Sequence, residues 1–154
     1  MGALKENILY RSASPCDNDH NRAADFSEKR ARGLATAAGH EGPFLVHCVE
    51  GKDRIDYVMM ILEALAGATY REILDDYMLT YDNYYQINQI TDPERYQIIR
   101  EKNIDERIAY MTGMDAKADF FKVDLALSAQ RLLIGMGMTE EQVNLLKRKI
   151  ADVK

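Results

Sequence analysis

Residues 47–54 read His-Cys-Val-Glu-Gly-Lys-Asp-Arg, and they hold the residue types with the clearest chemistry in this chain. Five residues separate a cysteine, Cys48, from an arginine, Arg54. In a chain of this composition a Cys-x5-Arg pair alone is expected by chance about 0.14 times. The histidine before the cysteine and the glycine inside the loop lower that expectation to the order of 10⁻⁴. Chance is therefore a poor explanation of the pattern.

The spacing suits a phosphate-binding loop that runs directly into a helix. Backbone N–H groups at a helix N-terminus lack intrahelical partners and favour an anion. The same positive field would lower the pKa of Cys48, so that the nucleophilic thiolate forms near neutral pH. Arg54 would grip two phosphate oxygens with its planar fork. The loop residues expected to contact the phosphate are Val49, Glu50, Gly51, which lets the chain turn, and Lys52.

Two short β-leaning runs and a larger set of helices must position this loop. Residues 43–49, introduced by Gly42 and Pro43, predict a strand buried on both faces, and residues 8–12 predict a weaker one. The helical patterns cover residues 27–38 before Gly39, 54–66 before Gly67, a segment opened by Thr69 and Glu72, one opened by Asp92 and Pro93, 105–111, 114–134, and a last one opened by Thr139 and Gln142. Most of the tyrosines on these helices (Tyr70, Tyr77, Tyr81, Tyr84 and Tyr85) are interpreted as packing residues.

Length and charge restrict the class of protein. A chain of 154 residues is one domain's worth, and no linker or repeat divides it, so residues 1–154 are expected to form a single domain. A net charge of −5 argues against a broad nucleic-acid-binding face. The longest apolar run, residues 57–62, is far shorter than the roughly 20 residues of a membrane span. With two cysteines and no leader pattern, we expect a cytoplasmic protein without disulfides.

The loop at residues 47–54 resembles the signature loop of the cysteine-dependent protein tyrosine phosphatase superfamily, in its atypical bacterial branch, which also resembles the cysteine phytases. Residues 9–15 (LYRSASP), 21–23 (NRA), 40–43 (HEGP) and 75–81 (DDYMLTY) are similar to further motifs of that branch. The resemblance covers nearly the whole chain. It implies a phosphocysteine intermediate, no metal or other cofactor, and substrates that are phosphoproteins, phosphoinositides or other small phosphate esters.

The chain departs from the family pattern at two places. Ile55 and Asp56 follow Arg54, where the family has Thr-Gly or Ser-Gly, so a hydroxyl that helps to discharge the phosphoenzyme is missing. Ala23 also runs almost directly into residues 26–29, where the family carries further strand and helix units. We therefore expect an α/β, helix-rich, truncated tyrosine-phosphatase-like fold with a small parallel sheet of few strands. Its exposed strand edges predict a homodimer, with exchange of an N-terminal segment as one form.

For most of the remaining candidate site residues, both a functional and a purely structural role fit the sequence. The resemblance maps the general acid onto Asp53, which would otherwise cap the following helix, and Asp17 and Asp19 are reserve candidates. His47 is expected to orient the loop or tune the thiolate, and Lys52 either steers anionic substrates or is a solvated lysine. Two arginines in the N-terminal motifs, Arg11 and Arg22, are equally interpretable as substrate contacts or as surface residues. Cys16 is interpreted as an ordinary thiol.

Three functions follow from this reading, in order of preference. The first is a phosphatase in which Cys48 attacks phosphorus, Arg54 holds the phosphoryl group and Asp53 protonates the leaving oxygen. The second is a catalytically impaired relative that binds phosphate or acts as an interaction module. The third is a helical interaction protein whose loop is a relic. Turnover of a phosphate ester separates the first from the others, and stabilisation by millimolar phosphate separates the second from the third.

Overall fold

The computed structural model describes residues 8–13, 26–48 and 53–151. For residues 9–13, 26–30, 48, 53 and 54 it describes the backbone alone. Helices dominate the described part, as the sequence predicts. They are α1 (Phe26–Gly39), α2 (Asp53–Leu65), α3 (Tyr70–Tyr85), α4 (Pro93–Ile99), a π-helical segment (Arg100–Asp105), α5 (Glu106–Thr112), a 3-10 helix (Phe120–Lys122), α6 (Leu125–Gly135) and α7 (Glu140–Ile150). The strands are β1 (Leu9–Ala13) and β2 (Phe44–Cys48).

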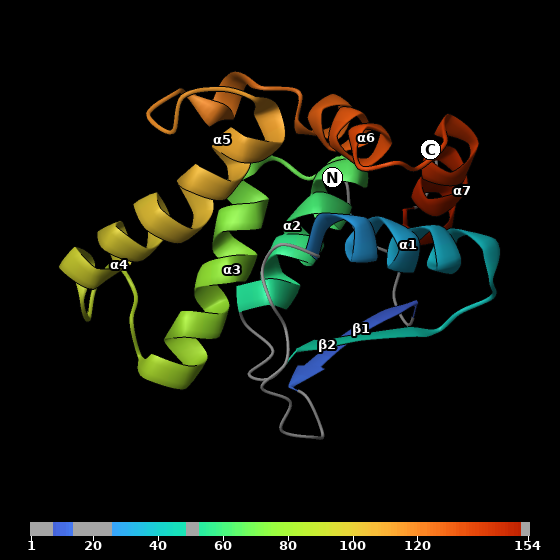
Figure 1. The fold of residues 1–154 in the computed structure, drawn as a ribbon. Coiled ribbons are helices and arrows are strands. Elements are labelled where there is room, and N and C mark those ends of the chain that lie inside the picture. Colours follow the sequence, from blue (N-terminus) through green and yellow to red (C-terminus); the bar gives the residue numbers. More distant parts are fainter. Residues whose placement is uncertain (1–7, 14–25, 49–52, 152–154) are drawn as a thin grey trace.

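The helix α2 lies at the centre of the helices of this chain (Figure 1). The helices α1 and α7 pack against each other on one flank, α5 packs against α6, and α4 lies on the side of α3 away from α2 (Figure 1). Five apolar residues on one stripe of α2 are buried, as the sequence predicts: Ile55, Val58, Met59, Leu62 and Leu65. No helix in the described ranges has the length and apolar character to cross a bilayer.

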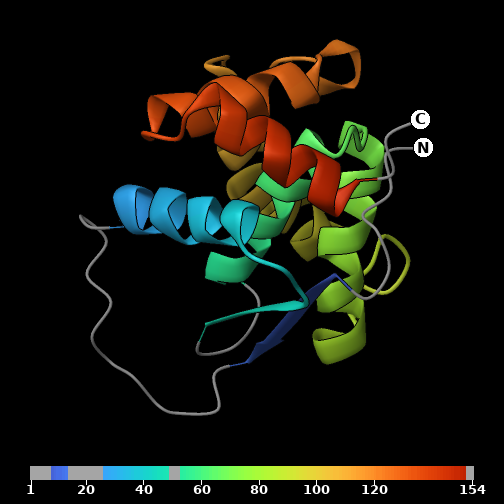
Figure 2. The same ribbon diagram turned by 90° about the vertical axis from the view of Figure 1, so that its right-hand side faces the viewer.

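The two strands pair in parallel, with Leu9 opposite Phe44 and Ala13 opposite Cys48. Figure 2 shows this pair beneath α1, at the edge of the helical layers. The prediction that residues 43–49 are buried on both faces is wrong, because Leu45 is 60 % exposed and His47 is exposed too. Phe44 and Val46 are half-buried. In the described part of the chain, helices cover one face of β2 only, so the strand has an inner and an outer side.

The local signals for helix ends are confirmed where the sequence places them. Thr69 and Thr139 each form a capping box, with Glu72 and Gln142 respectively. Asp92 caps α4, which has Pro93 in its first turn. After α2, Gly67 has a φ of 94°, a left-handed conformation that favours glycine.

Two stretches differ from the predicted helices. The helix expected at residues 105–111 is continuous with α4 through the π-helical segment. The helix expected at residues 114–134 begins only at Leu125, where Asp124 caps α6. Before that point, Asp115 and Asp119 accept hydrogen bonds from backbone N–H groups two residues later. Such local bonds compete with the helix, which explains the delayed start.

A buried polar network joins α3 to the π-helical segment. The hydroxyl of Tyr70, a residue that is 2 % exposed, donates a hydrogen bond to Asp105 and accepts one of 3.0 Å from Nε of Arg100. Arg100 also lies 3.6 Å from the Asp105 carboxylate. Burial, followed by the hydrogen bond to Asp105, raises the pKa of Tyr70 from 10.0 to about 12.

This shift makes the fold sensitive to alkaline pH. The folded state holds the Tyr70 proton more tightly than the unfolded state, so the stabilisation is complete below pH 10 and is lost as the pH rises towards 12. We expect the free energy of unfolding to fall by on the order of 2 kcal/mol over this interval. Urea titrations across it should show a shallower fall for Tyr70→Phe, whereas Tyr84→Phe, at a 77 % exposed position, should follow the wild type. Identical pH profiles for all three proteins would refute the assignment.

Lys149 on α7 fixes the end of α1 and the start of β2. Its Nζ donates hydrogen bonds to the carbonyl oxygens of Ala37 and Ala38, each at 3.0 Å, and to that of His40. It also lies 5.6 Å from the ring centroid of Phe44. A cation at the carbonyl end of a helix satisfies free acceptors and opposes the negative end of the helix dipole.

Lys149→Met should therefore destabilise the protein by about 2 kcal/mol, because several carbonyl groups lose a charged donor. For a domain of this size the loss corresponds to a fall in Tm of roughly 4–8 °C. Differential scanning calorimetry measures the effect. Lys147→Met, two residues earlier on the same helix, is the matched control and should change Tm little; equal losses in the two variants would contradict this role.

Candidate active site

The predicted loop is flanked by a strand and a helix at the expected positions. The strand β2 ends at Cys48, and α2 begins at Asp53 with Arg54 as its second residue, one residue earlier than the sequence predicts. The residues between them, Val49, Glu50, Gly51 and Lys52, lie outside the described residues. Four residues separate the end of β2 from the start of α2, and the unpaired N–H groups of the first turn of α2 point back along the chain towards β2.

The parallel register places the end of β1 beside the end of β2. Ala13 is opposite Cys48, and Arg11, in the middle of β1, is opposite Val46. Because parallel strands share their carboxyl edge, Ala13 and Cys48 end the two strands at the same edge of the sheet. The other candidates of the N-terminal motifs fall outside the described residues: Cys16, Asp17, Asp19 and Arg22.

His47 is the one predicted site residue whose side-chain exposure the structure describes. It is exposed, as is Leu45 two positions earlier, and its backbone is opposite Ser12. Alternation along a strand puts residues two apart on one face, so His47 belongs to the outer face of β2. The role of His47 in orienting the loop or tuning the thiolate stays a prediction.

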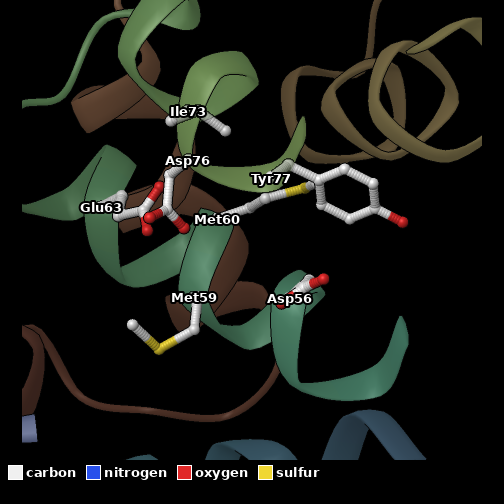
Figure 3. A pocket seen from close by; sticks show the side chains of 7 residues that line it. All are labelled: Asp56, Met59, Met60, Glu63, Ile73, Asp76 and Tyr77. Carbon is white, nitrogen blue, oxygen red and sulfur yellow. The ribbon is translucent and has the colours of Figure 1, made fainter. Parts of the chain in front are cut away.

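The two residues that depart from the family pattern are both buried in the first turns of α2. Ile55 and Asp56 are each 2 % exposed. Asp56 lines a small hollow between α2 and α3 (Figure 3), which is too shallow to enclose a water molecule. The other lining residues are Met59, Met60, Glu63, Ile73, Asp76 and Tyr77. The carboxylate of Asp56 thus belongs to the packing between α2 and α3.

Tyr77 connects this hollow to α5. Burial raises the pKa of Tyr77 above its ordinary value, the cation of Arg107 opposes that change, and the negative charge of Asp56 adds to it. Nη1 of Arg107 donates a hydrogen bond of 3.4 Å to the Tyr77 hydroxyl, and its guanidinium carbon lies 5.8 Å from the ring centroid. The phenol therefore stays protonated at neutral pH, and its ring carries a cation on one side.

The tyrosines do not all pack as the sequence predicts. Tyr70, Tyr77 and Tyr81 are buried, in agreement with that prediction. Tyr84 and Tyr85 are exposed, because α3 extends past its neighbours at this end. The sequence analysis also missed a contact between Tyr57 on α2 and Tyr110 on α5, whose ring centroids are 6.4 Å apart. No spacing signal could have found it, since α3, α4 and the π-helical segment separate the two residues along the chain.

Comparison with known proteins identifies the protein family of this chain. A family model described as tyrosine phosphatase family matches residues 21–151, which include the whole of the predicted loop. The chain therefore belongs to the tyrosine phosphatase family, and this membership supports phosphatase function. No curated protein and no solved structure matches the chain. In the described residues no cluster of three or more His, Cys, Asp or Glu side chains is arranged to hold a metal ion.

Proposed function

We propose that this protein is a cysteine-dependent phosphatase that hydrolyses phosphate monoesters through a phosphocysteine intermediate. The observation that carries the proposal is the tyrosine phosphatase family match over residues 21–151, a range that includes the Cys-x5-Arg sequence. The backbone supports it, because β2 ends at Cys48 and α2 begins at Asp53. Within the family, the sequence HCVEGKDR favours the atypical bacterial branch, in a shortened form.

The proposed reaction has two displacements at phosphorus. The Cys48 thiolate attacks, the S–P bond forms, and the P–O bond to the leaving group breaks as Asp53 donates its proton to that oxygen. Water then attacks the phosphocysteine, Asp53 accepts a proton, and phosphate leaves as the S–P bond breaks. The backbone N–H groups of residues 49–54 and the Arg54 guanidinium stabilise the charge on the equatorial oxygens.

Ile55 is expected to slow the second displacement. It lies at the family's hydroxyl position, and its apolar side chain is 2 % exposed, so it offers no hydrogen bond to a sulfur leaving group. We therefore infer that hydrolysis of the phosphocysteine limits the rate. A burst of one equivalent of alcohol or phenol before steady turnover is the kinetic signature of this order.

A homodimer remains part of the proposal. The sheet has two strands in the described part of the chain, and the outer face of β2 carries Leu45 at 60 % exposure. Parallel sheets are normally covered on both faces, so a second copy that packs on this face would bury what one chain leaves open. Light scattering at micromolar concentration should give twice the monomer mass for the wild type and a lower mass for Leu45→Lys. A monomeric wild type would refute the dimer.

The function is tested by incubating the wild type with p-nitrophenyl phosphate, phosphotyrosine, phosphoserine and a soluble phosphoinositide. We expect release of inorganic phosphate from at least one of them, with a bell-shaped, acid-leaning pH profile because Asp53 must be protonated while Cys48 is not. Stabilisation by millimolar phosphate without any turnover would replace the enzyme by a phosphate-binding module. If the protein showed no turnover and phosphate did not stabilise it, both the enzyme and the phosphate-binding module would be refuted.

A further inference from the structure

We propose that the second half of α3 and the loop after it bind a basic, amphipathic segment of a partner protein. The residues that form this interaction surface, which we call the α3 surface, are Asp75, Leu79, Asp82, Tyr84, Tyr85 and Ile90. The inference goes beyond the proposed phosphatase and is independent of the Cys-x5-Arg loop. Apolar exposure defines the surface, and the distribution of charge defines the partner.

The outer face of α3 carries an exposed leucine. Leu79 is 53 % exposed, whereas the neighbouring Met78 is buried. Asp75, four residues earlier, and Asp82, three residues later, lie on the same face as Leu79, because residues three and four apart are neighbours on a helix surface. An apolar side chain thus lies between two carboxylates on this face of the helix.

Two tyrosines extend the apolar surface around the last turn of α3, the end of the helix that lies farther from α5 (Figure 1). Tyr84 and Tyr85 are 77 % and 49 % exposed, and their ring centroids are 6.3 Å apart. The ring of Tyr85 also packs against that of the buried Tyr81, at 5.6 Å between centroids. Aromatic side chains are enriched in protein–protein interfaces, so this turn is suited to contact a partner.

The loop after α3 holds one apolar side chain in the solvent. Ile90 is 92 % exposed. Oδ1 of Asn88 accepts hydrogen bonds of 2.8 Å from the backbone N–H groups of Ile90 and Thr91. Nδ2 of Asn88 donates a hydrogen bond of 2.7 Å to Asp82, which ties the loop to α3. The backbone around Ile90 is therefore ordered before a partner binds, and an ordered segment loses less conformational entropy on binding.

Residues in and around the α3 surface account for the net negative charge of the chain. Residues 72–94 contain six acidic residues and no lysine, arginine or histidine, which gives a net charge of −6. The rest of the chain has 20 basic and 19 acidic residues, a net charge of +1. Arg95, the next residue, lies 3.7 Å from Asp92 in a surface ion pair, which offsets one of the six charges. The field around Leu79 is therefore negative.

This combination of apolar and acidic groups selects the partner. Interfaces place apolar residues at their centre and polar residues at the rim, and the charges across them are complementary. A partner of the α3 surface therefore presents leucine-type side chains flanked by lysine or arginine. An amphipathic helix with a basic rim has this pattern. An anionic membrane surface lacks it, because the carboxylates of the α3 surface repel anionic headgroups.

A fluorescently labelled peptide of about 14 residues tests the proposal, since as a helix it forms about four turns. It contains leucine and lysine at helical spacing, and a peptide with glutamate in place of each lysine is its control. Fluorescence anisotropy measures the Kd of each peptide for the full chain. The protein variants are Leu79→Gln, Ile90→Gln and Asp75→Lys, all at exposed positions, and melting curves establish that they fold.

Two further variants are matched controls outside the α3 surface. Leu127→Gln changes a leucine on α6 that is 41 % exposed. Glu41→Lys reverses the charge of an exposed residue between α1 and β2. Each control makes the same kind of change as a variant of the α3 surface, so a difference between them reports the position of the binding site.

We expect the wild type to bind the lysine peptide at one site and not to bind the glutamate peptide. Leu79→Gln and Ile90→Gln should each raise the Kd about three- to tenfold, because an apolar contact is lost. Asp75→Lys should raise it about tenfold, because it places like charges opposite each other. Leu127→Gln and Glu41→Lys should bind the peptide as the wild type does.

Three results would overturn the proposal. The first is no binding of the lysine peptide to the wild type. The second is an equal loss in each variant and its control, which would show a diffuse attraction between the peptide and an acidic protein. The third is a lower mass of Leu79→Gln or Ile90→Gln in light scattering, which would show that a second copy of this chain covers the α3 surface.

Discussion

Replacing Cys48 by serine is expected to lower the rate of p-nitrophenyl phosphate hydrolysis by at least roughly 10³-fold. The nucleophile in the proposed reaction is a thiolate, which forms near neutral pH when a helix N-terminus and an arginine lower the cysteine pKa. A serine hydroxyl in the same place stays protonated and attacks phosphorus poorly. Loss of a covalent nucleophile removes most of an enzyme's chemical rate enhancement, whereas substrate binding persists.

The control for this substitution is the other cysteine of the chain. Cys16→Ser removes a thiol of the same size and should retain wild-type turnover. Cys48→Ser should still be stabilised by phosphate in a melting experiment, because the binding groups are unchanged. Comparable turnover of Cys48→Ser and the wild type would exclude Cys48 as the nucleophile.

Arg54→Lys is expected to reduce kcat by about 10²- to 10³-fold, even though the positive charge is kept. A guanidinium donates two parallel hydrogen bonds to two phosphate oxygens, whereas an ammonium is a point charge without that geometry. Removal of one donor that stabilises transition-state charge has an effect of this size. Steady-state kinetics should show the loss mainly in kcat, since the contact is strongest in the transition state.

An arginine-to-lysine substitution far from the loop is the control, because it shows whether such a substitution lowers kcat at any position. Arg95 on α4 has a side chain that is 70 % exposed and lies 3.7 Å from Asp92, one turn earlier. Arg95→Lys should leave both kcat and KM unchanged, because a surface ion pair contributes little. If Arg54→Lys and Arg95→Lys had the same kinetics, the phosphate-binding role of Arg54 would be wrong.

The helices were predictable where local chemistry determines them. Thr69 and Thr139 form capping boxes whose partners lie three residues away, and Asp92 with Pro93 starts α4 in the same local way. The apolar stripe of α2 follows from its spacing alone. At residues 114–124, side chains such as Asp119 bind nearby backbone groups instead, and the amphipathic pattern was misleading there.

Features that depend on distant parts of the chain were not predictable. The exposure of Leu45 depends on which helices cover β2, and a strand's apolar run cannot reveal that. The contact of Tyr57 with Tyr110, and that of Lys149 with the end of α1, join residues far apart in sequence. Periodicity identifies one face of an element but not the partner that packs on it.

The sequence predicts the order of the elements that form the candidate site: a strand, a loop and then a helix. The strand that ends at Cys48 and the helix that begins at Asp53 follow from an apolar β-leaning run, a glycine-containing loop and a helical pattern. The parallel register that sets Ala13 beside Cys48 required the structure. The roles of Cys48, Asp53 and Arg54 come from the resemblance and from family membership, and they stay predictions.

A crystal structure of the wild-type protein with orthovanadate tests the central claim most directly. Vanadate accepts a fifth ligand and mimics phosphorus during the displacement. We expect vanadium bonded to Sγ of Cys48, its equatorial oxygens bound by backbone N–H groups of residues 49–54 and by both terminal nitrogens of Arg54. Vanadate bound elsewhere, or a thiol and a guanidinium that point away from each other around an unoccupied loop, would contradict the account.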